Sequence, residues 1–142
     1  MRLLVVRHAS AGERARWKGD DRLRPLDSRG RSQARGLVSL LEPFRPERLV
    51  SSPYVRCVQS LEPLAAARDI PIEPRDELAE GMGRDAFAAL VAELGCPAAL
   101  CVHGDLLEEL LGGDRPRKKG SVWVFEADGA ELRPERYLAP PA

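Results

Sequence analysis

The sequence predicts an α/β fold: a three-layer sandwich with a mostly parallel central sheet, helices on both faces of the sheet and a C-terminal β-hairpin. Short aliphatic runs alternate along the chain with stretches whose apolar residues recur every three or four positions, which is typical of alternating strands and helices. The first run, residues 3–6, has no polar gap, as expected of a strand buried on both faces. Near the C-terminus, two further runs flank Asp128-Gly129, a dipeptide typical of tight hairpin turns.

Composition narrows the class of protein. The chain has 142 residues, which is enough for one domain that buries about 68% of its unfolded surface. Lys plus Arg (22) equals Asp plus Glu (22), so we expect no bulk attraction to nucleic acid or to an anionic membrane. There is no membrane-spanning run, no signal-peptide pattern and no metal-ligand spacing among the three cysteines. We therefore expect a cytoplasmic protein without nucleic-acid or membrane partners.

A long irregular segment and a helix follow the first strand. Residues 9–27 show no sustained apolar period, so we expect a structureless loop of the kind that acts as a lid or binding loop. Asp27 or Ser28 would then cap a helix, because apolar residues recur at helical spacing from Ala34 until Pro43 ends it.

A second strand and helix come next. Residues 48–51 predict the strand, and Ser52-Pro53 is typical of an N-cap followed by proline at the first helical position. Pro63 would kink this helix or restart it. The positions that helical spacing turns inward are Val58, Leu61 and Ala65.

A third strand and helix follow. Residues 70–73 predict a strand that Pro71 places at a sheet edge. Residues 76–85 predict an acidic, glycine-rich loop, and the apolar spacing of residues 87–94 predicts a helix that ends at Gly95.

The last part of the chain combines a strand, a short helix and the hairpin. Residues 98–102 predict the fourth strand, and Asp105 with Glu108 forms a capping-box-like start for a helix with an apolar face. A basic loop then leads to the hairpin, and we expect the residues from Pro134 onward to fray. The hairpin strands are predicted at 122–125 and near 132–137.

Polar residues that can bind a phosphate follow three of the predicted strands. Arg7 and His8 end the first strand, Arg56 lies in the first turn of the helix after the second, and His103 follows the fourth. The carboxyl ends of parallel strands and the N-termini of helices are where α/β folds bind anions. Arginine supplies a fixed charge, and histidine supplies a nucleophile or proton carrier. Ordinary surface roles for these residues are the alternative, but both histidines of the chain meet at one sheet edge, which favours a phosphate site.

Four short segments occur in a recognisable order. They are Val-Arg-His-Ala at 6–9, Ser-Ser-Pro-Tyr-Val-Arg-Cys-Val-Gln-Ser at 51–60, Leu-Ala-Glu at 78–80 and Val-His-Gly at 102–104. Together they resemble the motifs of the histidine phosphatase superfamily, whose fold is phosphoglycerate mutase-like, although Ala9 stands where that family usually has glycine. The small size resembles SixA-type phosphohistidine phosphatases. Residues 16–20, 24–27 and 29–30 resemble the phosphatase domain joined to some Nudix hydrolases. The resemblance implies a single histidine phosphatase domain over residues 1–142.

The resemblance implies a catalytic histidine. His8 would attack phosphorus through a neutral ring nitrogen and form a phosphohistidine, and the charges of Arg7 and Arg56 would lower the pKa of its imidazole. Glu80 would protonate the leaving oxygen and then activate water, with Glu77 in reserve. The groups expected to bind the equatorial oxygens are Arg7, Arg56, Gly104 and the second catalytic histidine, His103.

The resemblance also implies a reaction and a substrate class. We expect metal-independent hydrolysis of a phosphate monoester or phosphoramidate without a cofactor, foremost on a phosphohistidine protein and alternatively on a nucleotide or other phosphorylated small molecule. A mutase is disfavoured because the chain is short, and a phosphate-binding interaction module without turnover is the alternative of another class. Trp17 is either a lid aromatic over the substrate or a packing residue. The loop residues expected near the substrate are Ser10, Arg14 and Trp17.

Overall fold

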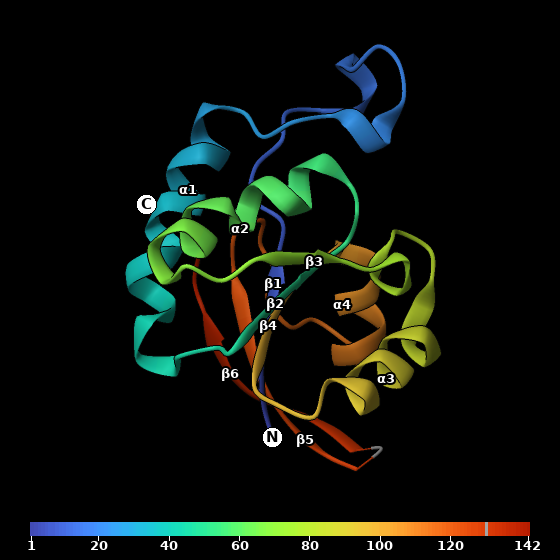
Figure 1. Ribbon diagram of the computed structural model, residues 1–142. Helices are drawn as coiled ribbons and strands as arrows, with labels where there is room; N and C mark the ends of the chain where they lie inside the picture. Colours follow the sequence, from blue (N-terminus) through green and yellow to red (C-terminus); the bar gives the residue numbers. More distant parts are fainter. Residues whose placement is uncertain (130) are drawn as a thin grey trace.

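The computed structural model describes residues 1–129 and 131–142 and shows the predicted α/β sandwich (Figure 1). Within this part of the chain, six strands form one sheet in the order β3-β2-β4-β1-β5-β6. The first four strands of the chain run parallel, whereas β5 pairs antiparallel with both β1 and β6, which confirms the C-terminal hairpin. The strands are β1 (Arg2–Arg7), β2 (Arg48–Ser51), β3 (Ile72–Pro74), β4 (Ala98–Val102), β5 (Val122–Asp128) and β6 (Glu131–Leu138).

Helices cover both faces of the sheet. α1 packs against α2 on one face, and α3 packs against α4 on the other (Figure 1). No helix among the described residues has both the length and the apolar character needed to cross a membrane. The α-helices are α1 (Ser28–Leu41), α2 (Val55–Arg68), α3 (Gly83–Leu94) and α4 (Gly104–Leu111). Short 3-10 turns are η1 (Arg14–Arg16), η2 (Asp21–Leu23), η3 (Glu42–Phe44) and η4 (Asp76–Leu78).

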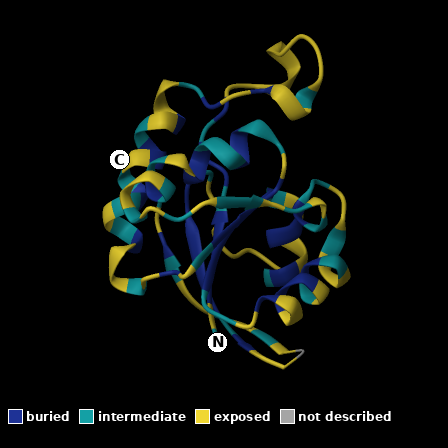
Figure 2. Cartoon of the chain, in the orientation of Figure 1, coloured by how far each residue is buried: buried dark blue, intermediate teal, exposed yellow. Residues whose placement is uncertain are grey.

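Strand β1 explains why the first aliphatic run has no polar gap. Leu3 and Val5 pack into the core beneath α3 and α4, whereas Leu4 and Val6 pack into the core beneath α1 and α2. All four side chains are at most 2% exposed, so the strand is buried on both faces (Figure 2). Burial of each such side chain stabilises the fold by about 1.5–3 kcal/mol, which holds rigid the strand that carries the first polar pair at its tip.

The start and the buried face of α2 differ from the prediction. The helix begins at Val55 with Tyr54 at the N-cap position, because the Ser52 hydroxyl, the predicted cap, is hydrogen-bonded to the ring of His103. Pro63 lies inside one continuous helix and does not restart it. The buried apolar positions are Cys57, Leu61 and Leu64, whereas the predicted positions 58 and 65 are half-buried.

Helix α4 also starts before its predicted capping box. It begins at Gly104 with His103 at the N-cap position. The Asp105 carboxylate does not cap the helix, because it accepts a hydrogen bond of 2.8 Å from the backbone N–H of Gly81. This bond ties the first turn of α4 to the segment before α3.

Several segments predicted to be irregular are more ordered, because they are bound to the rest of the fold. Residues 9–27 contain η1 and η2, and residues 76–85 contain η4 and the first turn of α3. Strand β3 lies at the predicted sheet edge but begins at Ile72. The chain does not fray after residue 134, since β6 continues to the buried Leu138 and Pro141 lies against α1.

Candidate active site

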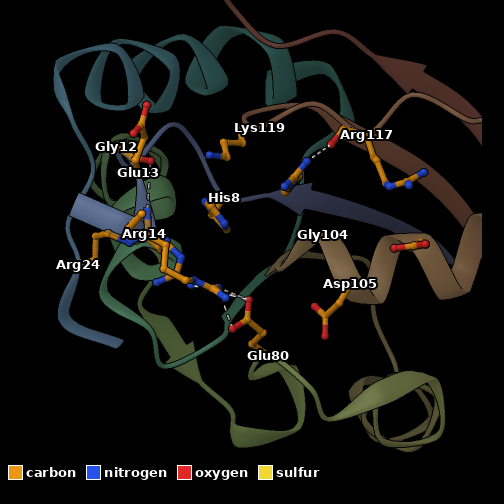
Figure 3. A pocket seen from close by; sticks show the side chains of 14 residues that line it. His8, Gly12, Glu13, Arg14, Arg24, Glu80, Gly104, Asp105, Arg117 and Lys119 are labelled. Carbon is orange, nitrogen blue, oxygen red and sulfur yellow. Dashed lines mark hydrogen bonds and ion pairs between the residues drawn. The ribbon is translucent and has the colours of Figure 1, made fainter. Parts of the chain in front are cut away.

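The ends of β1 and β4 and the first turn of α2 meet at one edge of the sheet, as predicted. They border a cavity of about 740 Å³ to which the segment of η1 also contributes (Figure 3). Six residues singled out in the sequence line this cavity: Arg7, His8, Arg14, Arg56, Glu80 and Gly104.

The ring of His8 is fixed in one tautomer by its own backbone. Its side chain is almost fully buried, and Nδ1 donates a hydrogen bond of 2.9 Å to the carbonyl of Ala9, which can only accept. The N–H of Ala9 in turn donates to the hydroxyl of Ser60 at 2.9 Å. Because Nδ1 carries the proton, Nε2 of His8 holds the lone pair that a nucleophile needs.

Burial keeps the imidazole of His8 neutral. The pKa of His8 is lowered from 6.5 to about 3, chiefly by burial and in smaller part by His103, Arg56 and Arg7, while the bond to Ala9 acts in the opposite direction. The sequence predicted the direction of this shift and attributed it to the two arginines. Burial is the larger cause, because removing water penalises the charged ring directly.

The second histidine lies edge-on to the first. The ring centroids of His8 and His103 are 5.5 Å apart, and Nε2 of His103 lies 2.8 Å from the Ser52 hydroxyl. The Tyr54 ring packs against His103 with centroids 4.6 Å apart. These contacts fix the orientation of His103, although its side chain does not form part of the cavity lining.

Arg56 is held by the loop that follows β1. Its side chain is fully buried, and its two terminal nitrogens donate to the carbonyl oxygen (2.8 Å) and the carboxylate (3.0 Å) of Asp21. Arg7 donates from Nη1 to the carbonyl of Arg117 at 2.7 Å. The loop and the segment before β5 therefore position the two guanidinium groups.

Three nitrogens around His8 are buried and have no hydrogen-bond partner among the described residues. They are Nε of Arg7, Nε of Arg56 and Nδ1 of His103. A buried hydrogen-bond donor without a partner lowers the stability of the fold by about 1–3 kcal/mol. The protein itself supplies no acceptor for these nitrogens among the described residues. Their clustering fits the recognition of an anion with several acceptor oxygens.

Gly104 allows Arg7 to approach the start of α4. A Cβ atom added at Gly104 would lie 2.9 Å from Cζ of Arg7, closer than side-chain carbons pack. Burial first, and then the charge of Arg117, lowers the pKa of the Arg7 guanidinium. A negative charge bound here would be stabilised by that crowding of positive charge.

Of the two acids expected from the resemblance, Glu80 lines the cavity and Glu77 does not. Arg14 donates to both oxygens of Glu80 at 2.7 and 2.9 Å, and Nη2 of Arg56 lies 4.0 Å from the nearer oxygen (Figure 3). Glu77 is paired with Arg75 outside the cavity lining. The reserve acid is therefore not brought to the site.

Of the three loop residues expected near the substrate, only one lines the cavity. Arg14 lines the cavity. Ser10 does not, because its hydroxyl donates to the carboxylate of Asp27 at 2.8 Å and so helps to close the loop onto α1. Trp17 borders a neighbouring hollow instead. The expected substrate contact of Ser10 is thus replaced by a contact that supports the loop.

Several charged residues of the site were not assigned to it from the sequence. The additional lining residues are the cations Arg24, Arg117 and Lys119 and the carboxylates Glu13, Asp105 and Glu108 (Figure 3). Asp21 lies outside the lining and accepts two hydrogen bonds from Arg56. Burial, followed by the charges of Arg7 and Arg24, lowers the pKa of Lys119, whose ammonium has no carboxylate within ion-pair distance in the described part of the chain. The charged loops were visible in the sequence, but no local signal separates these residues from their solvated neighbours.

The described residues contain no group of three or more His, Cys, Asp or Glu side chains that could hold a metal ion.

The chain resembles known proteins in both sequence and fold. The sequence profile of the Histidine phosphatase superfamily (branch 1) matches residues 3–93. An 8-oxo-(d)GTP phosphatase of Mycolicibacterium smegmatis is 39% identical over 98% of this chain, which corresponds to 48% of the relative, so the chain spans about half the length of that protein. The SixA structure from Agrobacterium tumefaciens is 25% identical with a TM-score of 0.78 over 98% of each chain. A protein histidine phosphatase SixA complexed with tungstate shares the fold at 22% identity and a TM-score of 0.76, over 99% of this chain and 97% of the other.

Proposed function

Because this chain belongs to the Histidine phosphatase superfamily (branch 1), as its motifs predicted, we propose that it is a phosphatase that transfers a phosphoryl group first to His8 and then to water. The observation that carries the proposal is the set of buried, unpartnered nitrogens around His8, from Arg7, Arg56 and His103. Phosphate oxygens would accept from both arginines and from the Nδ1–H tautomer of His103. A neutral His8 with a free Nε2 then faces the phosphorus.

In the first step, Nε2 of His8 attacks phosphorus while the bond to the leaving oxygen breaks. Arg7 and Arg56 stabilise the negative charge on the equatorial oxygens in the transition state. The ring gains positive charge as the N–P bond forms, and the carbonyl of Ala9 stabilises it through the Nδ1–H bond. Glu80 is the proposed donor of a proton to the leaving oxygen.

In the second step, water attacks the phosphohistidine. Glu80 accepts a proton from this water as the new P–O bond forms and the N–P bond breaks. Inorganic phosphate leaves, and His8 returns to its neutral form. The pKa of about 3 favours this return, because the buried site disfavours a protonated ring.

We propose a nucleotide as the substrate. The relative named for 8-oxo-(d)GTP supports this assignment, since its likeness extends over nearly the whole of this chain. Lys119 adds a positive charge to the cavity beyond the arginines, which suits a polyanionic substrate. Glu80 reaches the cavity, and the sugar oxygen released from a nucleoside monophosphate is a poor leaving group that needs a proton donor.

A phosphohistidine protein, the substrate first expected from the sequence, is the second candidate. The likeness of the fold to SixA structures supports it. The imidazole that leaves from phosphohistidine needs less help from an acid than an alkoxide does, so the two candidates differ in how much they depend on Glu80.

Hydrolysis of p-nitrophenyl phosphate in the presence of EDTA tests the reaction. We expect His8→Ala to lower the rate by at least about a thousandfold, and we expect chelation to leave the wild-type rate unchanged. The intermediate should be trapped as an acid-labile, base-stable phosphate on the wild type and be absent from His8→Ala. A wild-type rate no faster than that of the variant would refute the enzyme and favour a phosphate-binding module.

A comparison of GMP with a phosphohistidine peptide tests the substrate. For a nucleotide phosphatase, kcat/KM is higher for GMP and falls strongly in Glu80→Gln. A higher kcat/KM for the phosphohistidine peptide, with little loss in Glu80→Gln, would instead establish the second candidate.

A further inference from the structure

The proposed mechanism leaves Trp17 without a role. Its side chain is 38% exposed and lies between η1 and η2, in the segment that projects from the body of the molecule (Figures 1 and 2). The ring is nevertheless fixed, because the indole N–H donates a hydrogen bond of 2.9 Å to the carbonyl of Asp20. An exposed aromatic face that is held in place can stack on another aromatic ring.

The segment that carries Trp17 is anchored to the phosphate site. Asp20 caps η2, and the carboxylate of Asp21 accepts hydrogen bonds from Arg24 (2.9 Å) and Arg56 (3.0 Å). Arg24 also donates to the carbonyl of Ala11 at 2.6 Å. The position of the indole ring is therefore coupled to that of the guanidinium that binds the phosphate.

Trp17 borders a hollow of about 310 Å³ that adjoins the cationic cavity. The apolar side chains that line the hollow with it are Ala11, Pro25 and Leu26. The hollow and the cavity share three lining residues, which are Gly12, Glu13 and Arg24. The charged residues Glu13, Arg16, Arg24 and Asp27 complete its border. A hollow with an aromatic and partly apolar wall thus lies beside the cavity proposed to bind the phosphate.

Resting on the proposed nucleotide substrate, we propose that this hollow is the nucleobase subsite, with the base stacked on Trp17 while the phosphate lies against His8. A nucleotide joins an aromatic base to a phosphate through a sugar, which matches two adjoining sites of unlike character. A sugar phosphate lacks the aromatic ring. In phosphohistidine the ring is bonded directly to phosphorus and would lie inside the cationic cavity.

Competitive inhibition of p-nitrophenyl phosphate hydrolysis tests the subsite. GMP and ribose 5-phosphate differ only in the base, so the ratio of their inhibition constants within one variant isolates the contribution of the base. We expect GMP to bind about tenfold or more tightly than ribose 5-phosphate to the wild type. Trp17→Ala should reduce this ratio to near one, whereas Trp17→Phe, which keeps a ring but loses the bond to Asp20, should retain most of it.

Leu23→Ala is the matched control. Leu23 is 60% exposed on η2 and lines neither the cavity nor the hollow, so its replacement should leave the ratio unchanged. Equal inhibition of the wild type by GMP and ribose 5-phosphate, or an unchanged ratio in Trp17→Ala, would overturn the subsite. Loss of the preference in Trp17→Phe as well would show that the indole only holds the loop. All of these outcomes are separate from a failure of the phosphatase itself, which would show as wild-type hydrolysis no faster than that of His8→Ala.

Discussion

The buried imidazole of His8 should make the fold sensitive to acid while the nucleophile stays available. Folding lowers the pKa of His8 from 6.5 to about 3. Between these two pH values His8 is protonated in the unfolded chain and neutral in the folded chain. The stability that comes from the neutral ring is therefore complete above about pH 6.5 and is lost as the pH falls toward 3. One pKa unit corresponds to about 1.4 kcal/mol at 25 °C. The loss between pH 6.5 and pH 4 should thus be about 3 kcal/mol.

Urea unfolding followed by tryptophan fluorescence, at several pH values from 7.5 to 4, measures this loss. His8→Asn removes the titrating ring, so the free energy of unfolding of the wild type should fall by about 3 kcal/mol more than that of the variant over this range. The chain has only two histidines, so NMR of the imidazole nitrogens can follow His8 directly. Parallel pH dependence of the two proteins, or a titration midpoint for His8 above about 5, would refute the reasoning.

The remaining predictions concern the acid, the added cation and the loop. Glu80→Gln should lower kcat for a nucleotide by about 10²- to 10⁴-fold, measured by phosphate release; Glu77→Gln, outside the cavity, is the control and should stay near the wild-type rate. Lys119→Met should raise KM for a nucleotide by about tenfold, measured by steady-state kinetics. Lys118 is the exposed neighbour, so Lys118→Met should change KM little. Equal changes of KM in the two variants would contradict a role for the cavity cation. Gly30→Ala should cost about 2 kcal/mol or more in thermal unfolding and impair activity, because its new Cβ would lie 1.9 Å from a carbonyl oxygen of the loop after His8; an unchanged Tm would show that the loop can move without cost.

The layers of the fold could be predicted because burial leaves a periodic trace in the sequence. The aliphatic run of β1 and the two runs of the hairpin are local patterns, and strands form at each of them. The expected turn was placed one residue early, because Asp128 is the last residue of β5 and pairs with Glu131. Helix starts were predicted less well. Ser52 and Asp105 are good capping residues by type, but each has a partner that is remote in the chain. Local propensity cannot show that competition.

The candidate site was predictable where chemistry and position coincide. Arg7 ends strand β1, His8 and His103 stand directly after strands, and Arg56 lies in the first turn of a helix, so topology alone brings them to one edge. Ser10 was predicted to contact substrate, yet its hydroxyl is bound to Asp27. Serine is suited to both tasks, and only the fold of the loop decides between them.

The sequence by itself determined the succession of strands and helices along the chain, the sheet edge at which the candidate site lies and the family. Tertiary structure alone decided that Asp21 holds Arg56 and that Lys119 reaches the cavity. It also brought Glu80, the acid that the resemblance preferred, to the cavity and left Glu77 outside. The physical reason is that buried apolar side chains recur at regular intervals along a strand or helix, so a short stretch of sequence is enough to show them. The partner of a charged side chain depends on segments that meet only after the chain has folded, and the sequence carries no periodic signal for that encounter.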